Sequence, residues 1–244
     1  SFFPPCSPKR YPTASCMSVM NLMMSAETTA KRGTPMKDKG LLLVVSGPSG
    51  AGKGTICDAL RLRFPSIHYS VSMTTRAPRK GEFDGVNYFF ADTRRFEELL
   101  AEDAFLEHAK VYDHYYGTPK NYVFSQLEKG NHVMLEIDVQ GAMQVKEKYP
   151  EGVFIYIVPP SMEVLSRRLH LRRTDSDAVI AKRLAKAGAE LDWIGNYDYV
   201  IINDDLKTAV DLAASIIRAE ECRSCRNDNL IASIKKMYMT KQER

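Results

Sequence analysis

The sequence lacks long hydrophobic runs, has few cysteines and carries no marked excess of either charge. No apolar stretch approaches the roughly 20 residues that a transmembrane helix needs, so we expect no membrane span. The five cysteines are scattered and odd in number, so we expect reduced thiols in a cytoplasmic protein rather than a disulfide scaffold. The net charge of +4 arises within residues 1–40, where six lysines and arginines face two acids. Bulk charge therefore gives no support to a nucleic-acid partner.

The two ends of the chain carry no pattern that indicates a folded domain. Residues 1–39 hold five of the twelve prolines and five of the eleven methionines, and we expect a disordered extension there. Their Ser-rich, acid-poor composition leaves an organelle transit peptide as the alternative to a cytoplasmic location. In the tail 222–244, Cys222 and Cys225 form a C-x-x-C. A zinc site usually needs four ligands, and neither a second pair nor a nearby His is present, so we expect no metal or redox site there.

The body of the chain alternates strand-like and helix-like segments. Its 44% apolar and 26% charged residues are sufficient for one sizeable core. The apolar runs expected to be strands are 41–45, 132–139, 153–158 and 199–202. The segments with helical spacing are 53–64, 93–102, 119–129, 161–170, 176–193 and 206–221. This alternation predicts an α/β fold of three layers, α/β/α, around a parallel central sheet. Turns and aromatic strands between Ser70 and Tyr116 interrupt it and indicate a small inserted subdomain.

Nine residues after the first expected strand, GPSGAGKGT from Gly47 to Thr55, have the composition of a phosphate-binding loop. Glycines let the backbone turn tightly enough for successive N–H groups to point at phosphate oxygens, and Lys53 adds a positive charge. A helix that starts near Lys53 directs the positive end of its dipole at the same anion. The sequence therefore predicts that this loop binds a nucleoside triphosphate. Because Gly54 stands where the commonest motif has Ser or Thr, we expect Mg²⁺ to be held mainly by nucleotide phosphates and water.

Two acids, Glu136 and Asp138, end a strand that is otherwise apolar. Their spacing directs both side chains to the same face of that strand, where burial is costly unless they meet a cation or a hydrogen-bond donor. Ligands of parallel sheets bind at the carboxyl ends of the strands. The pair therefore indicates a site at this edge, with a salt-bridged pair as the alternative.

A second polar cluster lies in the segment from Ser72 to Tyr88. Arg76 and Arg79 flank a proline, and their forked donors are suited to gripping one more phosphate, although a solvated basic turn would look alike. Further along the chain, Glu107 precedes the sequence YYGT at 115–118. A carboxylate accepts hydrogen bonds from the two N–H groups on the guanine edge, which adenine does not offer. The sequence therefore predicts a purine reader made of Ser72, Glu107, Thr118 and Asp138.

Arginines gather in a third cluster, and these are Arg167, Arg168, Arg172, Arg173 and Arg183. Arg168 and Arg172 fall four residues apart, so they share a helix face if that helix continues. Arginine donors stabilise the charge that spreads over a migrating phosphoryl group. The cluster indicates a lid that closes over phosphates, with a solvated charged helix pair as the alternative.

Together, five motifs resemble the guanylate kinase family over about residues 40–220. The motifs are GPSGAGKGT, the Ser72 to Tyr88 segment, Glu107 with YYGT, EIDVQG at 136–141 and INDD at 202–205. P-loops are widespread, but the second and third motifs are characteristic of this family's monophosphate site. The resemblance implies a domain over 40–221, with a GMP-binding insert at about 70–118 and a lid at about 168–183.

Residue roles follow from the resemblance. It implies that the ATP phosphates are held by Gly47, Pro48, Ser49, Gly50, Ala51, Gly52, Lys53, Gly54 and Thr55, with Asn203 on the adenine side. It implies that Arg76, Arg79, Tyr88 and Tyr116 hold the GMP phosphate and that Ser72, Glu107, Thr118 and Asp138 read guanine. Lys53, Arg168, Arg172 and Arg183 would act in catalysis, and Glu136 would lie near Mg²⁺, as would Thr55. Two positions depart from the family pattern: Glu136 is often Asp, and Arg173 replaces a small lid residue.

The sequence thus leads us to expect an enzyme that phosphorylates GMP, and dGMP, with ATP and Mg²⁺ in purine nucleotide metabolism. We expect a monomer or homodimer with small-molecule substrates and no nucleic-acid or membrane partner. Two alternatives stay open: a kinase for AMP, dTMP or another monophosphate, and a non-catalytic guanylate-kinase-like interaction domain.

Overall fold

A parallel five-stranded sheet forms the centre of the protein. The computed structural model describes residues 39–111, 113–171 and 176–239. In space the strands follow the order β2-β7-β1-β8-β9, and every pair is parallel. Their bounds are β1 Leu42–Ser46, β2 Ile67–Tyr69, β7 His132–Glu136, β8 Val153–Val158 and β9 Tyr199–Ile202. Strands such as β1 and β8 are near-continuous apolar runs because the sheet is covered on both faces.

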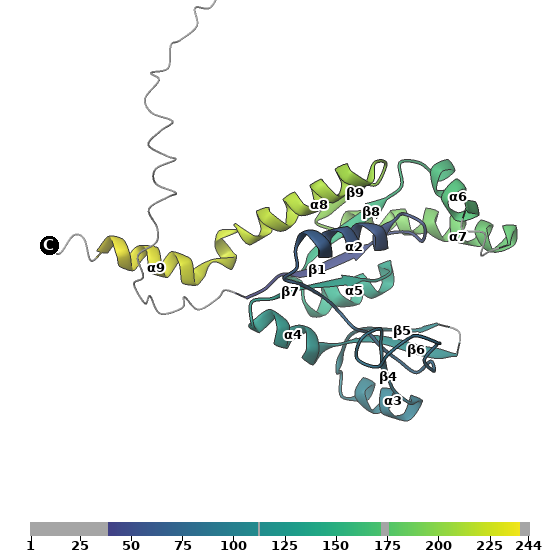
Figure 1. Cartoon of the computed structure of the whole chain (residues 1–244), viewed down its shortest axis with the longest axis horizontal. Coiled ribbons are helices and arrows are strands. Elements are labelled where there is room, and N and C mark those ends of the chain that lie inside the picture. Colours follow the sequence, from purple (N-terminus) through teal and green to yellow (C-terminus); the bar gives the residue numbers. More distant parts are fainter. Residues whose placement is uncertain (1–38, 112, 172–175, 240–244) are drawn as a thin grey trace, which may run out of the picture. The chain divides into compact units, whose positions relative to one another are not determined.

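Alternate residues of β1 face two separate hydrophobic layers. Leu43 and Val45 pack with helices α2 (Lys53–Arg63) and α8 (Leu206–Glu221), whereas Leu42 and Val44 pack with α4 (Lys120–Glu128) and α5 (Val139–Lys148). Figure 1 shows α2 and α8 on one side of the sheet and α4 and α5 on the other. The period of two along the strand thus produces the expected three layers.

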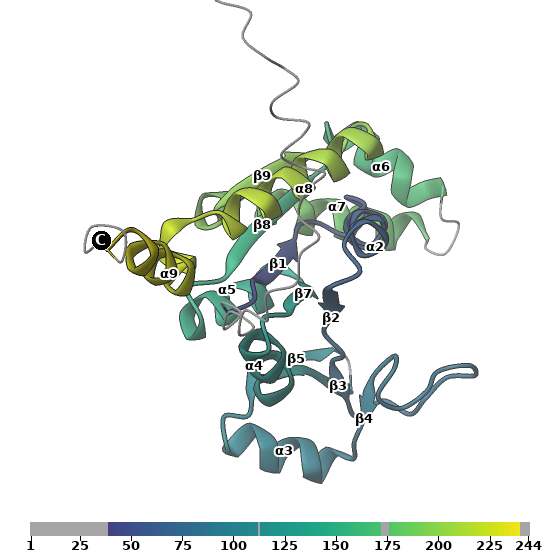
Figure 2. The same cartoon turned by 60° about the vertical axis from the view of Figure 1, so that its left-hand side comes forward.

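A second, four-stranded sheet lies beyond β2 in the order β4-β3-β6-β5 (Figure 2). Its elements are β3 Met73–Thr74, β4 Phe89–Phe90, α3 Thr93–Ala101, β5 Phe105–Val111 and β6 His114–Pro119. Its core is a ring stack in which Phe96 lies 4.5 Å from Phe105 and 5.2 Å from Tyr115 between ring centroids. Gly117 passes beside this stack, because a Cβ there would lie 2.8 Å from Phe105 Cδ1. Its strands carry Glu107, Tyr116 and Thr118 of the predicted acceptor site, and Ser72 and Tyr88 directly precede β3 and β4.

Helices α6 (Met162–Leu171) and α7 (Asp177–Glu190) pack together beside the carboxyl ends of the strands. Their contact consists of Leu165, Leu169, Ile180 and Ala187. A 3-10 helix, Leu191–Asn196, connects α7 to β9. After α8, a short 3-10 turn, Ser224–Arg226, leads to the exposed helix α9, Asp228–Met239.

Most expected elements are confirmed, with differences at their ends. The strand predicted for 132–139 is wrong beyond Glu136, because Asp138 caps α5 and its Oδ1 accepts from the Gly141 N–H at 2.9 Å. The expected helix 176–193 ends as an α-helix at Glu190 and continues as the 3-10 turn. Strand β2 and helices α5 and α9 were not predicted. The predicted extension 1–39 lies, apart from Lys39, outside the described residues.

Candidate active site

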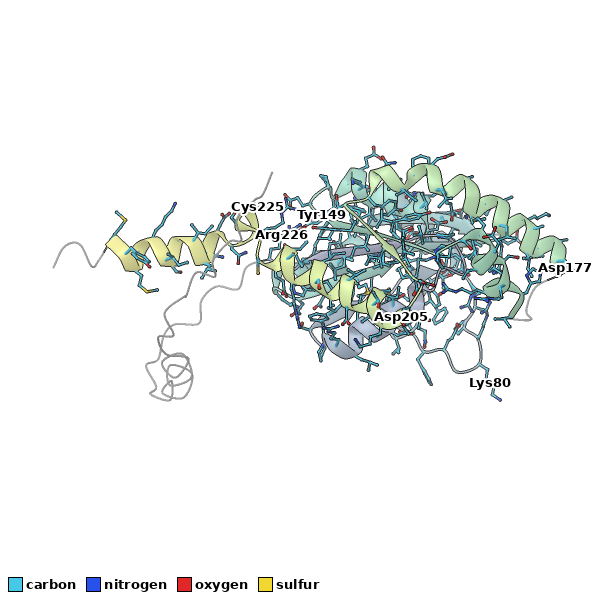
Figure 3. The ribbon with its side chains drawn as sticks, turned by 90° about the horizontal axis from the view of Figure 1, so that it is seen from above. Lys80, Tyr149, Asp177, Asp205, Cys225 and Arg226 are labelled. Atoms are coloured by element: carbon cyan, nitrogen blue, oxygen red, sulfur yellow. The ribbon has the colours of Figure 1, made fainter. Side chains whose placement is uncertain are left out.

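The predicted site residues gather at the carboxyl ends of the central strands. β1 leads into the phosphate-binding loop, β7 ends at Glu136, and β9 ends just before Asn203. Figure 3 shows Lys80, on the loop after Arg79, and Asp177, at the start of α7, at the opposite end of the sheet from Cys225 and Arg226. In parallel sheets this edge is where ligands bind.

The phosphate-binding loop runs from Gly47 to the first turn of α2, and its conformation depends on glycine. Gly47, Gly50 and Gly52 have φ angles of +138°, +94° and +94°, which side chains other than glycine adopt only with strain. A Cβ at Gly47 would also lie 2.1 Å from the carbonyl oxygen of Ile157. The loop therefore holds its backbone against β8 and opens at the N-terminus of α2, whose dipole favours an anion.

Lys53 is folded back onto this loop. Its Nζ donates to the carbonyl of Gly47 at 2.5 Å and to that of Pro48 at 3.2 Å. Burial lowers the pKa of Lys53, while the nearby carboxylates of Glu136 and Glu190 act in the opposite direction. The two carbonyls thus satisfy an ammonium group that stands at the position where the predicted triphosphate would be.

Glu136 stands across from Gly54 and is held by a tyrosine. The hydroxyl of Tyr69 donates to Glu136 Oε2 at 2.9 Å, and burial together with the Glu136 charge raises the pKa of Tyr69. A Cβ at Gly54 would lie 3.5 Å from the same Oε2. The carboxylate therefore faces the place where a Ser or Thr hydroxyl would stand, whereas the side chain of Thr55 is exposed to solvent.

Two of the predicted lid arginines contact the donor side of the site. Arg183 Nη1 lies 3.4 Å from Ser49 Oγ on the loop, and Arg168 Nη2 donates to the backbone carbonyl of Asn203 at 2.9 Å. Arg172 and Arg173 lie outside the described residues. The adenine contact of Asn203 stays a prediction, since in this structure its side-chain amide donates to the Ala51 carbonyl at 2.8 Å.

The predicted purine reader contains a preorganised carboxylate. Glu107 is 7% exposed and Thr118 1% exposed, and the Thr118 hydroxyl donates to Glu107 Oε1 at 2.6 Å. Burial raises the pKa of Glu107, although the Thr118 hydrogen bond opposes that shift. A Cβ at Gly141 would lie 3.1 Å from Glu107 Oε2, so the start of α5 passes close to this carboxylate. Asp138 caps the same helix through Oδ1.

Arg76, one of the two arginines predicted to bind the monophosphate, is held in place by an acid within its own segment. Arg76 Nη2 pairs with Glu82 Oε1 at 2.9 Å, and its guanidinium lies 5.4 Å from the centroid of the Tyr88 ring. The Tyr88 and Tyr116 rings lie 6.1 Å apart. Glu82 also accepts from the backbone N–H of Arg79 at 2.7 Å. The Arg79 residue is exposed, so its predicted contact with a phosphate would require a bound ligand or movement of the loop.

Two adjoining cavities bring many of these residues together, and Glu136 lines both. One, of about 290 Å³, is lined by Gly47, Ser49, Lys53, Glu136, Ile137, Asp138, Arg183, Lys186 and Glu190. The other, of about 120 Å³, is lined by Tyr69, Ser70, Ser72, Asn87, Tyr88, Thr118, Leu135, Glu136 and Ile137. Part of the predicted donor site and part of the predicted acceptor site thus open onto neighbouring spaces that share Glu136. The predicted residues that line neither cavity include Arg76, Arg79, Glu107, Tyr116, Arg168 and Asn203.

Sequence reasoning missed four side chains that shape the site. Tyr69 and Glu82 hold Glu136 and Arg76, as described above. Lys186 Nζ lies 3.7 Å from Asp138 Oδ2 and 3.5 Å from Glu190 Oε1, and burial raises the pKa of Glu190. Glu82 lay within the Ser72 to Tyr88 segment, and Lys186 with Glu190 has a helical i,i+4 spacing that the sequence displays. The contacts of Tyr69 with Glu136 and of Lys186 with Asp138 join distant parts of the chain, so no local signal could have identified them.

Potential metal ligands and free thiols were also located among the described residues. Within them, no three His, Cys, Asp or Glu side chains gather in a way that could hold a metal ion. Cys222 and Cys225 are exposed free thiols, and Cys57 is a buried one. Across the described ranges, no helix has both the length and the hydropathy to cross a bilayer.

Comparisons with known proteins agree with this geometry. A family model described as "Guanylate kinase" matches residues 39–220. The guanylate kinase of Caldanaerobacter subterraneus subsp. tengcongensis is 56% identical over 200 residues, covering 82% of this chain and 97% of that protein. The guanylate kinase of Carboxydothermus hydrogenoformans is 54% identical over 188 residues, covering 76% and 91%.

A solved structure shows the same similarity in three dimensions. The crystal structure of guanylate kinase from Anaplasma phagocytophilum aligns with a TM-score of 0.61 at 38% identity, covering 78% of this chain and 90% of that one. The residues matched by the family model include the loop, acceptor and lid motifs, and each of these relatives covers at least three quarters of the chain. The chain therefore belongs to the guanylate kinase family.

Proposed function

We propose that this chain transfers the γ-phosphoryl group of ATP to GMP, and to dGMP, releasing ADP and GDP or dGDP in purine nucleotide metabolism. The observation that carries this proposal is the pair of adjoining cavities that share Glu136. The first is lined by Gly47, Ser49 and Lys53 of the phosphate-binding loop. The second is lined by Ser72, Tyr88 and Thr118, which are three of the residues predicted to bind the monophosphate. Membership of the guanylate kinase family supports the same reaction. We assign GMP binding to the insert at about 70–118 and closure to the lid at about 168–183.

Catalysis in this proposal consists of positioning and charge stabilisation. An oxygen of the GMP phosphate attacks the γ-phosphorus of ATP, and the bond from that phosphorus to the β,γ-bridging oxygen breaks, leaving ADP. The acceptor phosphate is already ionised at neutral pH, so no general base is required. Lys53, Arg168, Arg172 and Arg183 stabilise charge on the transferring group, and lid closure excludes water that would otherwise hydrolyse ATP.

The family implies Mg²⁺, and the residues fit an ion that is held mainly by ATP phosphates and water. Gly54 offers no side-chain oxygen, whereas Glu136, fixed by Tyr69, presents a carboxylate to that side of the loop. When bound with ATP, Mg²⁺ neutralises part of the phosphate charge. Glu136 would accept hydrogen bonds from its water ligands, and Thr55 is the nearby hydroxyl.

Guanine selectivity rests on Glu107. Its carboxylate is buried and held by Thr118, which suits it to accept the two N–H donors of guanine. Adenine offers no matching donor pair, so a buried charge would be left unpaired, and such mismatches discriminate strongly. Ser72 and Asp138 complete the reader. A kinase for AMP or dTMP is the alternative that this carboxylate disfavours.

The non-catalytic interaction domain is disfavoured by the donor side. Lys53, Arg168 and Arg183 all contact the phosphate-binding loop or the strand end beside it. A module that only binds partner proteins has no need of that arrangement. We propose a cytoplasmic enzyme that acts as a monomer or homodimer on small-molecule substrates, without a nucleic-acid partner.

One coupled assay tests the proposed reaction. ADP release is followed with ATP and Mg²⁺ while GMP, dGMP, AMP or dTMP is offered as acceptor. We expect turnover with GMP and dGMP and rates at least 100-fold lower with the other two. Equal or faster turnover with AMP would overturn the assignment of guanine, and no turnover with any acceptor would favour the interaction domain.

A further inference from the structure

Asn203 connects three parts of the donor site that are far apart in sequence. It follows β9 directly, its backbone N–H donates to the carbonyl of Val158 at 2.8 Å, and it is only 6% exposed. Its side-chain Nδ2 donates to the Ala51 carbonyl at 2.8 Å, and its own carbonyl accepts from Arg168 Nη2 at 2.9 Å. One buried residue therefore contacts the end of β8, the phosphate-binding loop and a lid arginine.

Gly52 is shaped to this contact. A Cβ at Gly52 would lie 2.3 Å from Asn203 Nδ2, a separation that no real side chain could keep. Gly52 also has a φ of +94°, so the loop residue beside the amide is glycine for two reasons. The close approach lets the amide reach the Ala51 carbonyl at the turn just before Lys53, where successive backbone N–H groups must point towards the phosphates.

Arg168 has donor capacity left over. Its Nη2 is occupied by the Asn203 carbonyl, whereas Nη1 is buried and has no hydrogen-bond partner among the residues that the structure describes. A buried guanidinium nitrogen without an acceptor lowers the stability of the fold, so we interpret Nη1 as a donor that gains an acceptor when a ligand binds or the lid moves. The Asn203 carbonyl thus fixes one half of the guanidinium fork and leaves the other half for an incoming anion.

We propose that Asn203 is a positioning residue: it holds the phosphate-binding loop and Arg168 in the arrangement that receives the ATP phosphates. This role differs from the contact with adenine that the family resemblance implies for the same residue. It rests on the proposed function only in taking ATP as the natural ligand. A positioning residue affects every ligand of the loop, with or without a base, whereas a base contact affects only nucleotides that carry adenine.

The test compares ATP with inorganic tripolyphosphate, which has the phosphates but no base. Binding of each, with Mg²⁺, is measured by isothermal titration calorimetry on the full chain and on Asn203→Asp and Asn203→Ser. The first variant replaces the donor with an acceptor that faces the Ala51 carbonyl, and the second is too short to reach it. Asn131→Asp is the matched control, since Asn131 Nδ2 also donates within the protein, to Gln126 Oε1 at 2.9 Å, just before β7.

We expect both Asn203 variants to weaken ATP and tripolyphosphate by the same factor, at least tenfold, while GMP affinity stays within twofold of wild type. Asn131→Asp should leave all three affinities within twofold. Weakened ATP binding with unchanged tripolyphosphate binding would overturn the proposal in favour of a base contact. Equal loss of GMP affinity would reduce Asn203 to a general structural role, and no loss for any ligand would also refute it.

A second experiment uses only the wild-type chain, so its result does not depend on whether a variant folds. In ¹⁵N-labelled protein, the side-chain amide signal of Asn203 should shift on addition of tripolyphosphate much as it does with ATP. A shift with ATP alone would contradict the proposal. The calorimetric and NMR experiments measure binding at equilibrium, so their results hold even if the acceptor assay shows no transfer to GMP. Failure of the positioning role of Asn203 is therefore distinguishable from failure of the proposed reaction.

Discussion

The carboxylate of Glu107 offers the sharpest test of substrate recognition. The substitution Glu107→Gln keeps the size of the side chain but removes its charge and turns one acceptor into a donor. Thr118 occupies Oε1 through a 2.6 Å hydrogen bond, and both residues are buried, so the side chain has little freedom to adapt. An amide NH₂ would then confront one of the two guanine N–H donors.

The size of the effect follows from those two hydrogen bonds. A hydrogen bond to a charged group contributes about 1.5–3 kcal/mol, and a neutral one about 0.5–1.5 kcal/mol. Losing one charged bond and weakening the other therefore costs about 2–4 kcal/mol. Since each 1.4 kcal/mol is a factor of ten, kcat/KM for GMP should fall by about 30- to 1000-fold.

Steady-state kinetics with two acceptors make the assay specific. Inosine monophosphate lacks the 2-amino group of GMP, so the wild type should prefer GMP and Glu107→Gln should prefer it less. The KM for ATP should stay within twofold, because we propose that the ATP phosphates bind in the other cavity, beside Gly47 and Lys53. An unchanged kcat/KM for GMP, or a rise confined to the KM for ATP, would refute the role given to Glu107.

Stability measurements separate this loss from unfolding. Burial raises the pKa of Glu107. A carboxyl with a raised folded-state pKa contributes stability below its unfolded value, near 4.3, and that contribution is lost as the pH rises through the folded pKa. The wild type thus carries a buried charge at neutral pH that Glu107→Gln does not. We expect the free energy of unfolding of the variant at pH 7 to equal or exceed that of the wild type.

Three further substitutions test the rest of the site and the fold. Lys53→Ala should lower turnover by about 10³ or more while leaving the melting temperature within a few degrees, because the hydrogen bonds of Lys53 within the described residues go to the loop carbonyls of Gly47 and Pro48. Near-normal activity would contradict the mechanism. Tyr69→Phe removes the hydroxyl that donates to Glu136. In a magnesium titration, the Mg²⁺ concentration that gives the half-maximal rate should rise severalfold, while the KM for GMP stays unchanged. An unchanged Mg²⁺ concentration would count against a positioning role for Tyr69. Glu220→Gln should cost about 1–3 kcal/mol in urea unfolding at pH 7. Burial would raise the pKa of Glu220, but its hydrogen bonds with Tyr199 and the arginines lower it below the usual value. The difference in stability between wild type and Glu220→Gln should therefore vanish as the pH falls through the pKa of Glu220 in the folded protein. A difference that stays the same at acidic pH would refute this explanation.

Local patterns were enough to predict much of this protein. A loop of glycines between an apolar run and a periodic helix predicts a phosphate site because all its parts are neighbours in sequence. Arg76 and Arg79 were also predictable from a local pattern, although the Glu82 carboxylate that pairs with Arg76 was not identified from the sequence. Strands β1 and β8 were predictable because burial on both faces demands unbroken apolar runs.

The sequence pattern gave a wrong strand end at Asp138, a residue type that can either extend a strand or cap a helix. The pattern places Asp138 within the strand, yet β7 ends at Glu136 and the Asp138 carboxylate caps α5. No periodicity distinguishes a residue that extends a strand from one that caps the following helix. The choice depends on the packing of α5 against the sheet and on the need of its first N–H groups for acceptors.

The sequence by itself determined which groups are present: a glycine-rich loop with Lys53, the arginines Arg76 and Arg79, the carboxylate of Glu107 and a later cluster of arginines, for which we propose roles in binding phosphates and guanine. Tertiary structure alone decided which groups meet. Tyr69 reaches Glu136 across 67 residues and Asn203 reaches Ala51 across 152, because strand order brings the ends of β2, β7, β1 and β9 to one edge. Such contacts follow from how the sheet is wound, and no local spacing encodes them, since their free energy comes from burial that exists only once the layers have assembled.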